Sequence, residues 1–140
     1  MPTTNEALAT LSRIWEERKL GYEAKVSVKN DWAGLEIVPP CSGDSIVIYS
    51  PGDRWVSLQI PGGFSTIYFE EGMTSEDRLM WFERYVDAAI AYLNGHYVLH
   101  RSPRLRIPHV DINTSLRTVR LDLGPKATMC AVMTRGRARS

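Results

Sequence analysis

Three short segments rich in proline and glycine constrain the fold of this chain more than any other feature of its sequence. They are residues 39–43, 51–53 and 61–63, which read Pro-Pro-Cys-Ser-Gly, Pro-Gly-Asp and Pro-Gly-Gly. Each one separates two runs of strand-forming residues, and turns of this composition join neighbouring antiparallel strands. Parallel strands would need a crossover of about a dozen residues or more, and these segments are too short for one. The sequence therefore predicts an antiparallel meander.

The meander is expected to contain about five strands, at residues 22–28, 35–38, 45–50, 54–60 and 64–70. Apolar and polar side chains alternate in the first of these runs, as they do in a strand with one buried face. Trp32 falls in an expected turn at residues 30–34. Trp55 falls on the polar side of its strand, together with Ser57 and Gln59.

A helix is expected before the meander, because four apolar residues recur there at helical spacing: Leu8, Leu11, Ile14 and Trp15. Thr3 and Glu6 have the spacing of a capping box at its start. Arg18, Lys19 and Gly21 supply a cationic last turn and a stop.

A longer helix follows the meander, starting after Thr74 or Ser75 and ending at Asn94 and Gly95. One apolar stripe of this helix is suited to the core: Leu79, Phe82, Val86, Ala89, Ile90 and Leu93. A second apolar stripe lies about 120° round the helix: Trp81, Tyr85, Ala88 and Tyr92. One face of a sheet cannot cover both stripes, so a second surface must pack against this helix.

Further short strands are expected at residues 96–100, 104–112 and 116–123. We therefore predict an α+β fold with an N-terminal helix, a meander of about five strands, a long amphipathic helix on the sheet and short C-terminal strands. Residues 1–124 form one domain in this interpretation. Residues 125–140 form a basic tail, part of which can be a strand. A chain of 140 residues can bury a core without disulfides or metal.

The formal net charge of +1 conceals a segregation of charge along the chain. Residues 1–95 hold 8 basic and 14 acidic side chains, and residues 96–140 hold 9 basic and 2 acidic ones. The first part thus carries −6 and the second +7. Such a division indicates either a polyanionic partner or attraction between the two parts of one fold.

The basic part supplies candidate residues for binding nucleic acid: Arg101, Arg104, Arg106, Arg117, Arg120, Arg135, Arg137 and Arg139. Arginine suits bidentate contacts with phosphate. However, Tyr97 is the only aromatic residue after Gly95, so a base-stacking platform is not evident. Pairing of these arginines with the acidic part is the alternative, together with a loose tail.

Catalytic motifs are sparse, and we expect neither a catalytic site nor a cofactor. The chain contains no Gly-x-Ser-x-Gly and no phosphate-binding loop. Cys41 with one of the three histidines could form a Cys-His site, which makes an enzyme the third hypothesis. We expect no metal site, because His96 and His100 lie about 13 Å apart on an extended segment. His109 could approach them only through tertiary packing.

We expect the two cysteines, Cys41 and Cys130, to be free thiols. The first residues lack the pattern of a signal peptide, and no apolar run approaches the length of a membrane span. We therefore expect a cytoplasmic protein without a membrane partner.

Aromatic side chains provide the candidate residues for a protein interface: Trp32, Trp55, Trp81, Tyr85 and Tyr92. Tryptophan and tyrosine are the residue types that anchor such interfaces. The alternative for the helical aromatics is internal packing against the first helix through Leu11 and Trp15. Homodimerisation through the second helical stripe also stays open.

The order of elements over residues 1–123 resembles that of small α+β immunity proteins encoded beside bacterial toxin genes. Phe69, Glu70 and Glu71, which lead into the aromatic-rich helix, contribute to the resemblance. Other small α+β domains, secretion chaperones among them, share this order, and no functional residue is carried over. The resemblance implies a non-catalytic protein that binds and occludes a partner, and an acidic N-terminal part would suit a basic nuclease toxin. The alternative is a nucleic-acid-associated protein acting through the C-terminal arginines.

Overall fold

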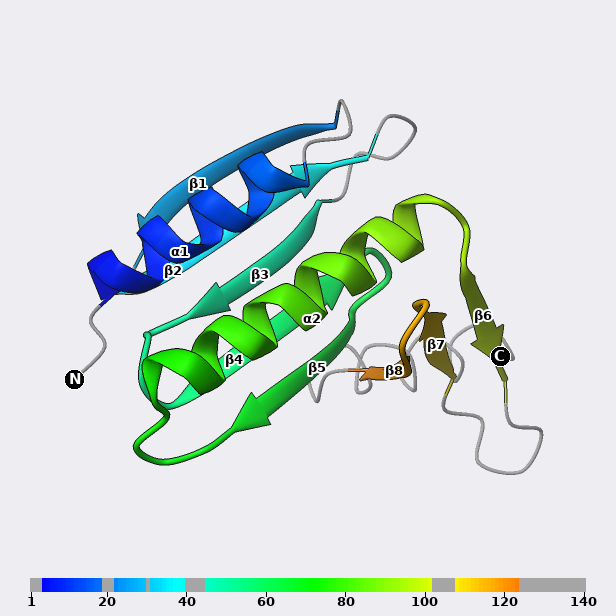
Figure 1. The fold of residues 1–140 in the computed structure, drawn as a ribbon. Coiled ribbons are helices and arrows are strands. Elements are labelled where there is room, and N and C mark those ends of the chain that lie inside the picture. Colours follow the sequence, from blue (N-terminus) through cyan, green and yellow to red (C-terminus); the bar gives the residue numbers. More distant parts are fainter. Residues whose placement is uncertain (1–3, 19–21, 30, 40–44, 102–107, 124–140) are drawn as a thin grey trace, which may run out of the picture.

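The computed structural model describes residues 4–18, 22–29, 31–39, 45–101 and 108–123. These residues form an α+β fold of one sheet and two helices (Figure 1). The helices are α1 (Thr4–Glu17) and α2 (Ser75–Leu93). The strands are β1 (Glu23–Lys29), β2 (Trp32–Val38), β3 (Ile46–Ser50), β4 (Trp55–Ile60), β5 (Phe64–Phe69), β6 (Tyr97–His100), β7 (His109–Asn113) and β8 (Thr118–Leu123).

The strands form a single antiparallel sheet in the order β1-β2-β3-β4-β5-β8-β7-β6. The five-strand meander predicted from the turn segments is confirmed, as are the short C-terminal strands. The last three strands form a second meander that joins the first between β5 and β8. In the described residues this junction consists of two register pairs, Phe64 with Leu123 and Ser65 with Asp122.

The hairpin between β1 and β2 differs from the expected turn at residues 30–34. Lys29 is paired directly with Trp32, so Trp32 is the first residue of β2 and not part of the turn. Asp31 adopts a positive φ of 62°. Aspartate tolerates this left-handed conformation better than most residues, which allows the chain to reverse within two residues.

Both ends of α2 are capped as the sequence predicts. The hydroxyl of Thr74 accepts a hydrogen bond of 3.1 Å from the backbone N–H of Asp77. At the other end, Gly95 has a φ of 81°. The backbone N–H groups of Gly95 and His96 donate to the carbonyls of Tyr92 and Ala91, which is the pattern of a Schellman motif.

Both helices cover the same face of the sheet (Figure 1). Helix α1 packs on β1 and β2, whereas α2 packs on β3, β4 and β7. The core lies between these layers and includes Leu11, Ile14, Leu35, Ile37, Ile48, Leu58, Phe82, Ile112 and Leu121. Neither of the described helices is both long and apolar enough to cross a membrane.

The second apolar stripe of α2 is covered because the helix lies between several surfaces. Trp81 of this stripe stacks on Tyr68 of β5, and Tyr92 stacks on Tyr97 of β6. Helix α1 and strand β7 also pack against α2. Tyr85 and Ala88 are buried, and Trp81 and Tyr92 are partly buried. An ion pair of 2.6 Å joins Arg18, which directly follows α1, to Asp87 of α2.

Candidate protein-binding face

The sheet face turned away from the helices, called the open face below, carries the candidate site. Alternation along the strands decides which side chains reach it. In β2, Ala33, Leu35 and Ile37 are buried toward the helices, so Trp32 and Glu36 lie on the open face. The register then assigns Tyr49 of β3 to the same face, because residues directly opposite each other project to one side.

Three aromatic side chains gather at one end of the open face and form the aromatic cluster: Trp32, Tyr49 and Trp55. The ring centroids of Trp32 and Trp55 lie 5.0 Å apart, and those of Tyr49 and Trp55 lie 5.5 Å apart, both pairs edge to face. Trp32 and Tyr49 stack at 5.7 Å. Trp32 nevertheless remains 41% exposed. The three rings therefore support one another while they present apolar surface to solvent.

The turn between β3 and β4 holds the aromatic cluster in place. The hydroxyl of Ser50 donates to the carbonyl of Trp55 and accepts a hydrogen bond of 3.0 Å from the N–H of Gly52. The hydroxyl of Thr4, in the first turn of α1, donates toward the carbonyls of Asp31 (2.8 Å) and Pro51 (3.1 Å). The two turns beside Trp32 and Trp55 are thus tied to each other through one side chain.

Arg78 of α2 lies buried beneath the same turn. Its Nη1 atom lies 3.4 Å from the carbonyl oxygen of Gly52, and its Nε atom has no hydrogen-bond partner among the described residues. Burial lowers the pKa of Arg78 from its ordinary value. Burying a charged side chain here costs stability. Arg78 also places the first turn of α2 against the turn that supports Trp55.

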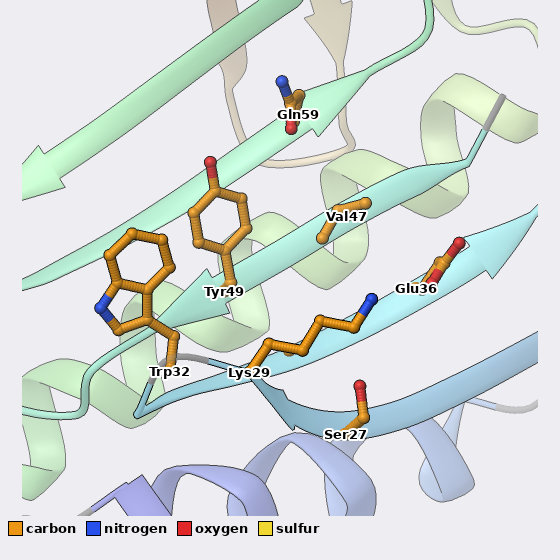
Figure 2. A pocket seen from close by; sticks show the side chains of 8 residues that line it. Ser27, Lys29, Trp32, Glu36, Val47, Tyr49 and Gln59 are labelled. Carbon is orange, nitrogen blue, oxygen red and sulfur yellow. The ribbon is translucent and has the colours of Figure 1, made fainter.

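A groove runs from the aromatic cluster along β1 to β4 and encloses about 380 Å³ (Figure 2). Its lining is formed by Ser27, Lys29, Trp32, Gly34, Glu36, Val47, Tyr49 and Gln59. Gly34 lies in β2, where it pairs with Ser27 of β1 on one side and Tyr49 of β3 on the other. Because Gly34 has no side chain, the groove passes over the backbone of β2 at this point.

The groove has an apolar end and a polar end. Figure 2 shows Trp32 and Tyr49 at one end and Glu36 at the other, with Lys29 between them. The hydroxyl of Ser45 donates a hydrogen bond of 2.8 Å to Oε1 of Glu36, which fixes this carboxylate. The arrangement suits an extended segment with an aromatic or aliphatic side chain followed by a polar one.

Exposed apolar residues extend the open face beyond the groove. Phe69 of β5 lies opposite Trp55, and Ile67 lies opposite Ser57. Phe69 is 65% exposed and Ile67 is 59% exposed. A contiguous group of exposed apolar side chains is typical of a surface that binds another macromolecule.

The aromatic residues of α2 occupy a different part of the molecule. Trp81 stacks on Tyr68 of β5 with centroids 3.9 Å apart, and Tyr92 stacks on Tyr97 at 4.5 Å. Tyr85 is only 3% exposed, and burial raises its pKa to about 12. Tyr85 is buried, and Trp81 and Tyr92 are partly buried against rings of the same molecule, so we do not include the three in the interface.

The structure describes three of the eight candidate arginines, Arg101, Arg117 and Arg120, and all three are exposed. Arg117 and Arg120 line a cavity of about 320 Å³ between β5 and β8, together with Arg84 of α2. The Nε atom of Arg120 also donates to Asp122 over 3.1 Å. The other candidates lie outside the described residues, as do both cysteines: Arg104, Arg106, Arg135, Arg137, Arg139, Cys41 and Cys130.

Two features of the open face are not predicted from the sequence. Tyr49 completes the aromatic cluster, and its alternation with the apolar residues Ile46 and Ile48 was the signal that could have found it. His100 and His109 lie opposite each other on β6 and β7, with Asp111 beside them. Only the strand register reveals that group.

Comparisons with family models, with curated proteins and with solved structures find no match to this chain. The resemblance to immunity proteins therefore stays a prediction.

Proposed function

We propose that this chain is a non-catalytic binding protein whose partner is another protein, docked on the open face. The observation that carries the proposal is the aromatic cluster. Trp32, Tyr49 and Trp55 contact one another on a sheet face that lies opposite both described helices.

Energetic arguments support this use of the cluster. Tryptophan and tyrosine contribute most to binding when they lie near the centre of an interface and become fully desolvated there. Here the rings are already held by the turns at Asp31 and Pro51, so little side-chain freedom is lost on binding. Exposed Phe69 and Ile67 would add apolar area at one flank of the interface.

The charges around the open face indicate the chemistry of the partner segment. Glu36 lines the polar end of the groove and Lys29 lines its middle, so the bound segment should place hydrogen-bonding or charged groups there. If the partner is a toxin, as the element order suggests, binding would occlude its active site. The net charge of −6 over residues 1–95 would then favour a basic partner.

Site-specific photo-crosslinking can test the proposal and identify the partner. A photoreactive phenylalanine analogue at position 32 or 55 should crosslink one protein of the source cell. The same analogue at position 116, which carries an exposed leucine in the turn between β7 and β8, serves as the matched control and should not crosslink it. Crosslinks to a second copy of this chain would show that the face is a homodimer interface.

Titration with the purified partner then gives the decisive measurement. We expect Trp32→Ala and Trp55→Ala each to weaken binding at least 30-fold, which corresponds to about 2 kcal/mol. Leu116→Ala should leave the affinity unchanged. Equal affinities of the wild type and both tryptophan variants would overturn the proposal.

A second candidate function, binding of nucleic acid, is favoured by one observation. Arg84, Arg117 and Arg120 line the same cavity between β5 and β8. If these arginines contact phosphates, binding of single- or double-stranded oligonucleotides should weaken steeply with salt, and Arg117→Ala should reduce that salt dependence. An affinity that does not change with salt would remove this candidate.

A further inference from the structure

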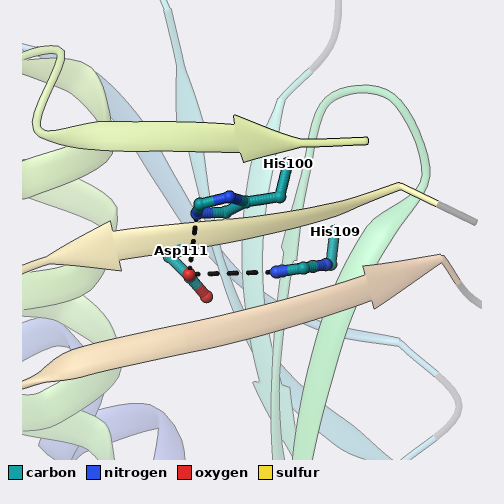
Figure 3. A group of neighbouring side chains, drawn as sticks. All are labelled: His100, His109 and Asp111. Atoms are coloured by element: carbon teal, nitrogen blue, oxygen red, sulfur yellow. Dashed lines mark ion pairs between the residues drawn. The ribbon is translucent and has the colours of Figure 1, made fainter. Parts of the chain in front are cut away.

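A group of three side chains with metal-binding chemistry lies on the open face, at the opposite end from the aromatic cluster. His100 of β6 pairs with His109 of β7, and Asp111 follows two residues later on the same side of β7. The Nε2 atom of His100 lies 3.0 Å from Oδ2 of Asp111, and that of His109 lies 3.9 Å from the same oxygen. Figure 3 shows both imidazoles directed at this carboxylate.

The spacing of the donor atoms fits one metal ion. The three candidate ligand atoms all lie within 4.8 Å of one another. Two ligands of a tetrahedral zinc ion lie about 3.3 Å apart, given bond lengths near 2.0 to 2.2 Å. The 3.0 Å and 3.9 Å separations lie on either side of this value, and the widest separation in the group, up to 4.8 Å, would have to shorten by rotation of the imidazoles. The imidazole planes, now 17° apart, would open as the nitrogens converge.

Strand pairing holds the backbone of His109 and Asp111 in position for metal binding. Strand β7 is hydrogen-bonded on both sides, to β6 and to β8, so His109 and Asp111 belong to an internal strand. The side chains of His109 and Asp111 are 21% and 27% exposed, and the side chain of His100, on the neighbouring strand β6, is 45% exposed. An ion could therefore reach the group from solvent, and the two ligands on β7 would need little reordering.

The donor set also defines the class of metal. Two imidazole nitrogens and one carboxylate oxygen suit divalent first-row transition metals such as zinc, and do not suit calcium or magnesium, which prefer oxygen ligands. Three protein ligands leave at least one position for water or for a ligand from a partner. Asp122 lies opposite His109 on β8, but its carboxylate is paired with Arg120.

We propose that His100, His109 and Asp111 bind one divalent transition-metal ion of the zinc class on the open face. This inference does not depend on the aromatic cluster. Loss of metal binding and loss of protein binding are separate outcomes of separate measurements.

Calorimetric titration of the full-length chain with Zn²⁺ tests the proposal. The chain should carry no histidine tag and should contain Cys41→Ser and Cys130→Ser, so that thiolates cannot supply the ligands. We expect one ion per chain. His100→Ala, His109→Ala and Asp111→Asn should each weaken the affinity at least tenfold.

The third histidine provides a matched control. His96 is exposed and lies outside the cluster, so His96→Ala removes one imidazole without touching the three proposed ligands. It should bind Zn²⁺ like the parent chain. Circular dichroism of each metal-free variant checks that the sheet is intact, and Zn²⁺ should raise the melting temperature of the parent but not of His109→Ala.

Spectroscopy with Co²⁺ gives an independent readout of the ligands. Co²⁺ held by imidazole and carboxylate should produce visible absorption bands that His100→Ala abolishes. The proposal fails if the parent chain binds no Zn²⁺ at roughly 100 µM, a concentration at which a site with a binding free energy of about −5.5 kcal/mol is half occupied. It also fails if stoichiometric binding survives both histidine substitutions.

Discussion

Gly34 of β2 lies directly opposite Tyr49 of β3, so the floor of the groove is bare backbone beside an aromatic ring. A Cβ atom built on Gly34 would approach its nearest neighbour, the carbonyl oxygen of Ser27, to 3.7 Å, which is an ordinary van der Waals contact. The position therefore has room for a small side chain. The groove is deep at this point because Gly34 has no side chain, although the fold does not require glycine there.

Substitution of Gly34 should separate binding from stability. We expect Gly34→Ala to raise the free energy of unfolding by about 0.5 kcal/mol, because glycine is unfavourable within a strand. Gly34→Leu should fill the groove and weaken binding of the partner at least tenfold. Urea denaturation and titration with the partner measure the two effects. Unchanged affinity of Gly34→Leu would show that the groove is not used.

Thr4→Val should loosen the turns that support the aromatic cluster. The substitution removes the hydroxyl that donates to the carbonyls of Asp31 and Pro51, and we expect a loss of about 1 kcal/mol in urea denaturation. Thr10→Val is the matched control, because the Thr10 hydroxyl donates within α1, to the carbonyl of Glu6 (2.8 Å). Equal effects of the two substitutions would contradict the role assigned to Thr4.

The tie between the helices should be weak and sensitive to salt. Arg18 and Asp87 form a short ion pair, but both side chains are partly exposed. We expect a double-mutant cycle with Arg18→Ala and Asp87→Ala to give a coupling energy of about 0.5 kcal/mol, smaller in 1 M salt. A coupling energy that does not respond to salt would indicate packing instead of charge.

Stability at alkaline pH should depend on Tyr85. Burial raises the pKa of Tyr85 to about 12, whereas the unfolded chain ionises near the ordinary value of 10.0. Tyr85 therefore keeps its proton to a higher pH in the folded state than in the unfolded state. The resulting contribution to stability is complete below pH 10 and is lost as the pH rises toward 12. A difference of about two pKa units corresponds to roughly 2 to 3 kcal/mol.

Tyr85→Phe removes the titrating group and should make the decline in stability less steep. Urea denaturation of both proteins between pH 8 and 11 measures this, and the free energy of unfolding of the wild type should fall relative to that of the variant as the pH rises, because only the wild type loses stability through Tyr85. Parallel curves over this range would show that Tyr85 ionises equally easily in both states.

The meander could be predicted because its turns are short and rich in proline and glycine, which leaves only antiparallel neighbours. Alternation within residues 54–60 likewise placed Trp55 opposite the buried side of its strand. The sequence predicts a turn at Trp32, because it does not reveal that Asp31 adopts a left-handed conformation and that Lys29 pairs directly with Trp32.

The histidine group could not be predicted for a different reason. His100 and His109 meet only because β6 and β7 pair in one particular register, and a shift by one residue would send one ring to the other face. The sequence between the two histidines contains Pro103 and Pro108, which mark interruptions but do not determine a register. Tertiary packing of β7 against α2 contributes to that choice.

The narrow junction between β5 and β8 has a consequence for how the molecule unfolds. Two register pairs transmit little cooperativity along the backbone, so the eight strands need not open together. Helix α2 bridges the junction, since it packs on β3 and β4 at one side and on β7 at the other. The helix thus acts as the mechanical coupling between two folding units, and amide exchange in β6 to β8 should report on the integrity of α2.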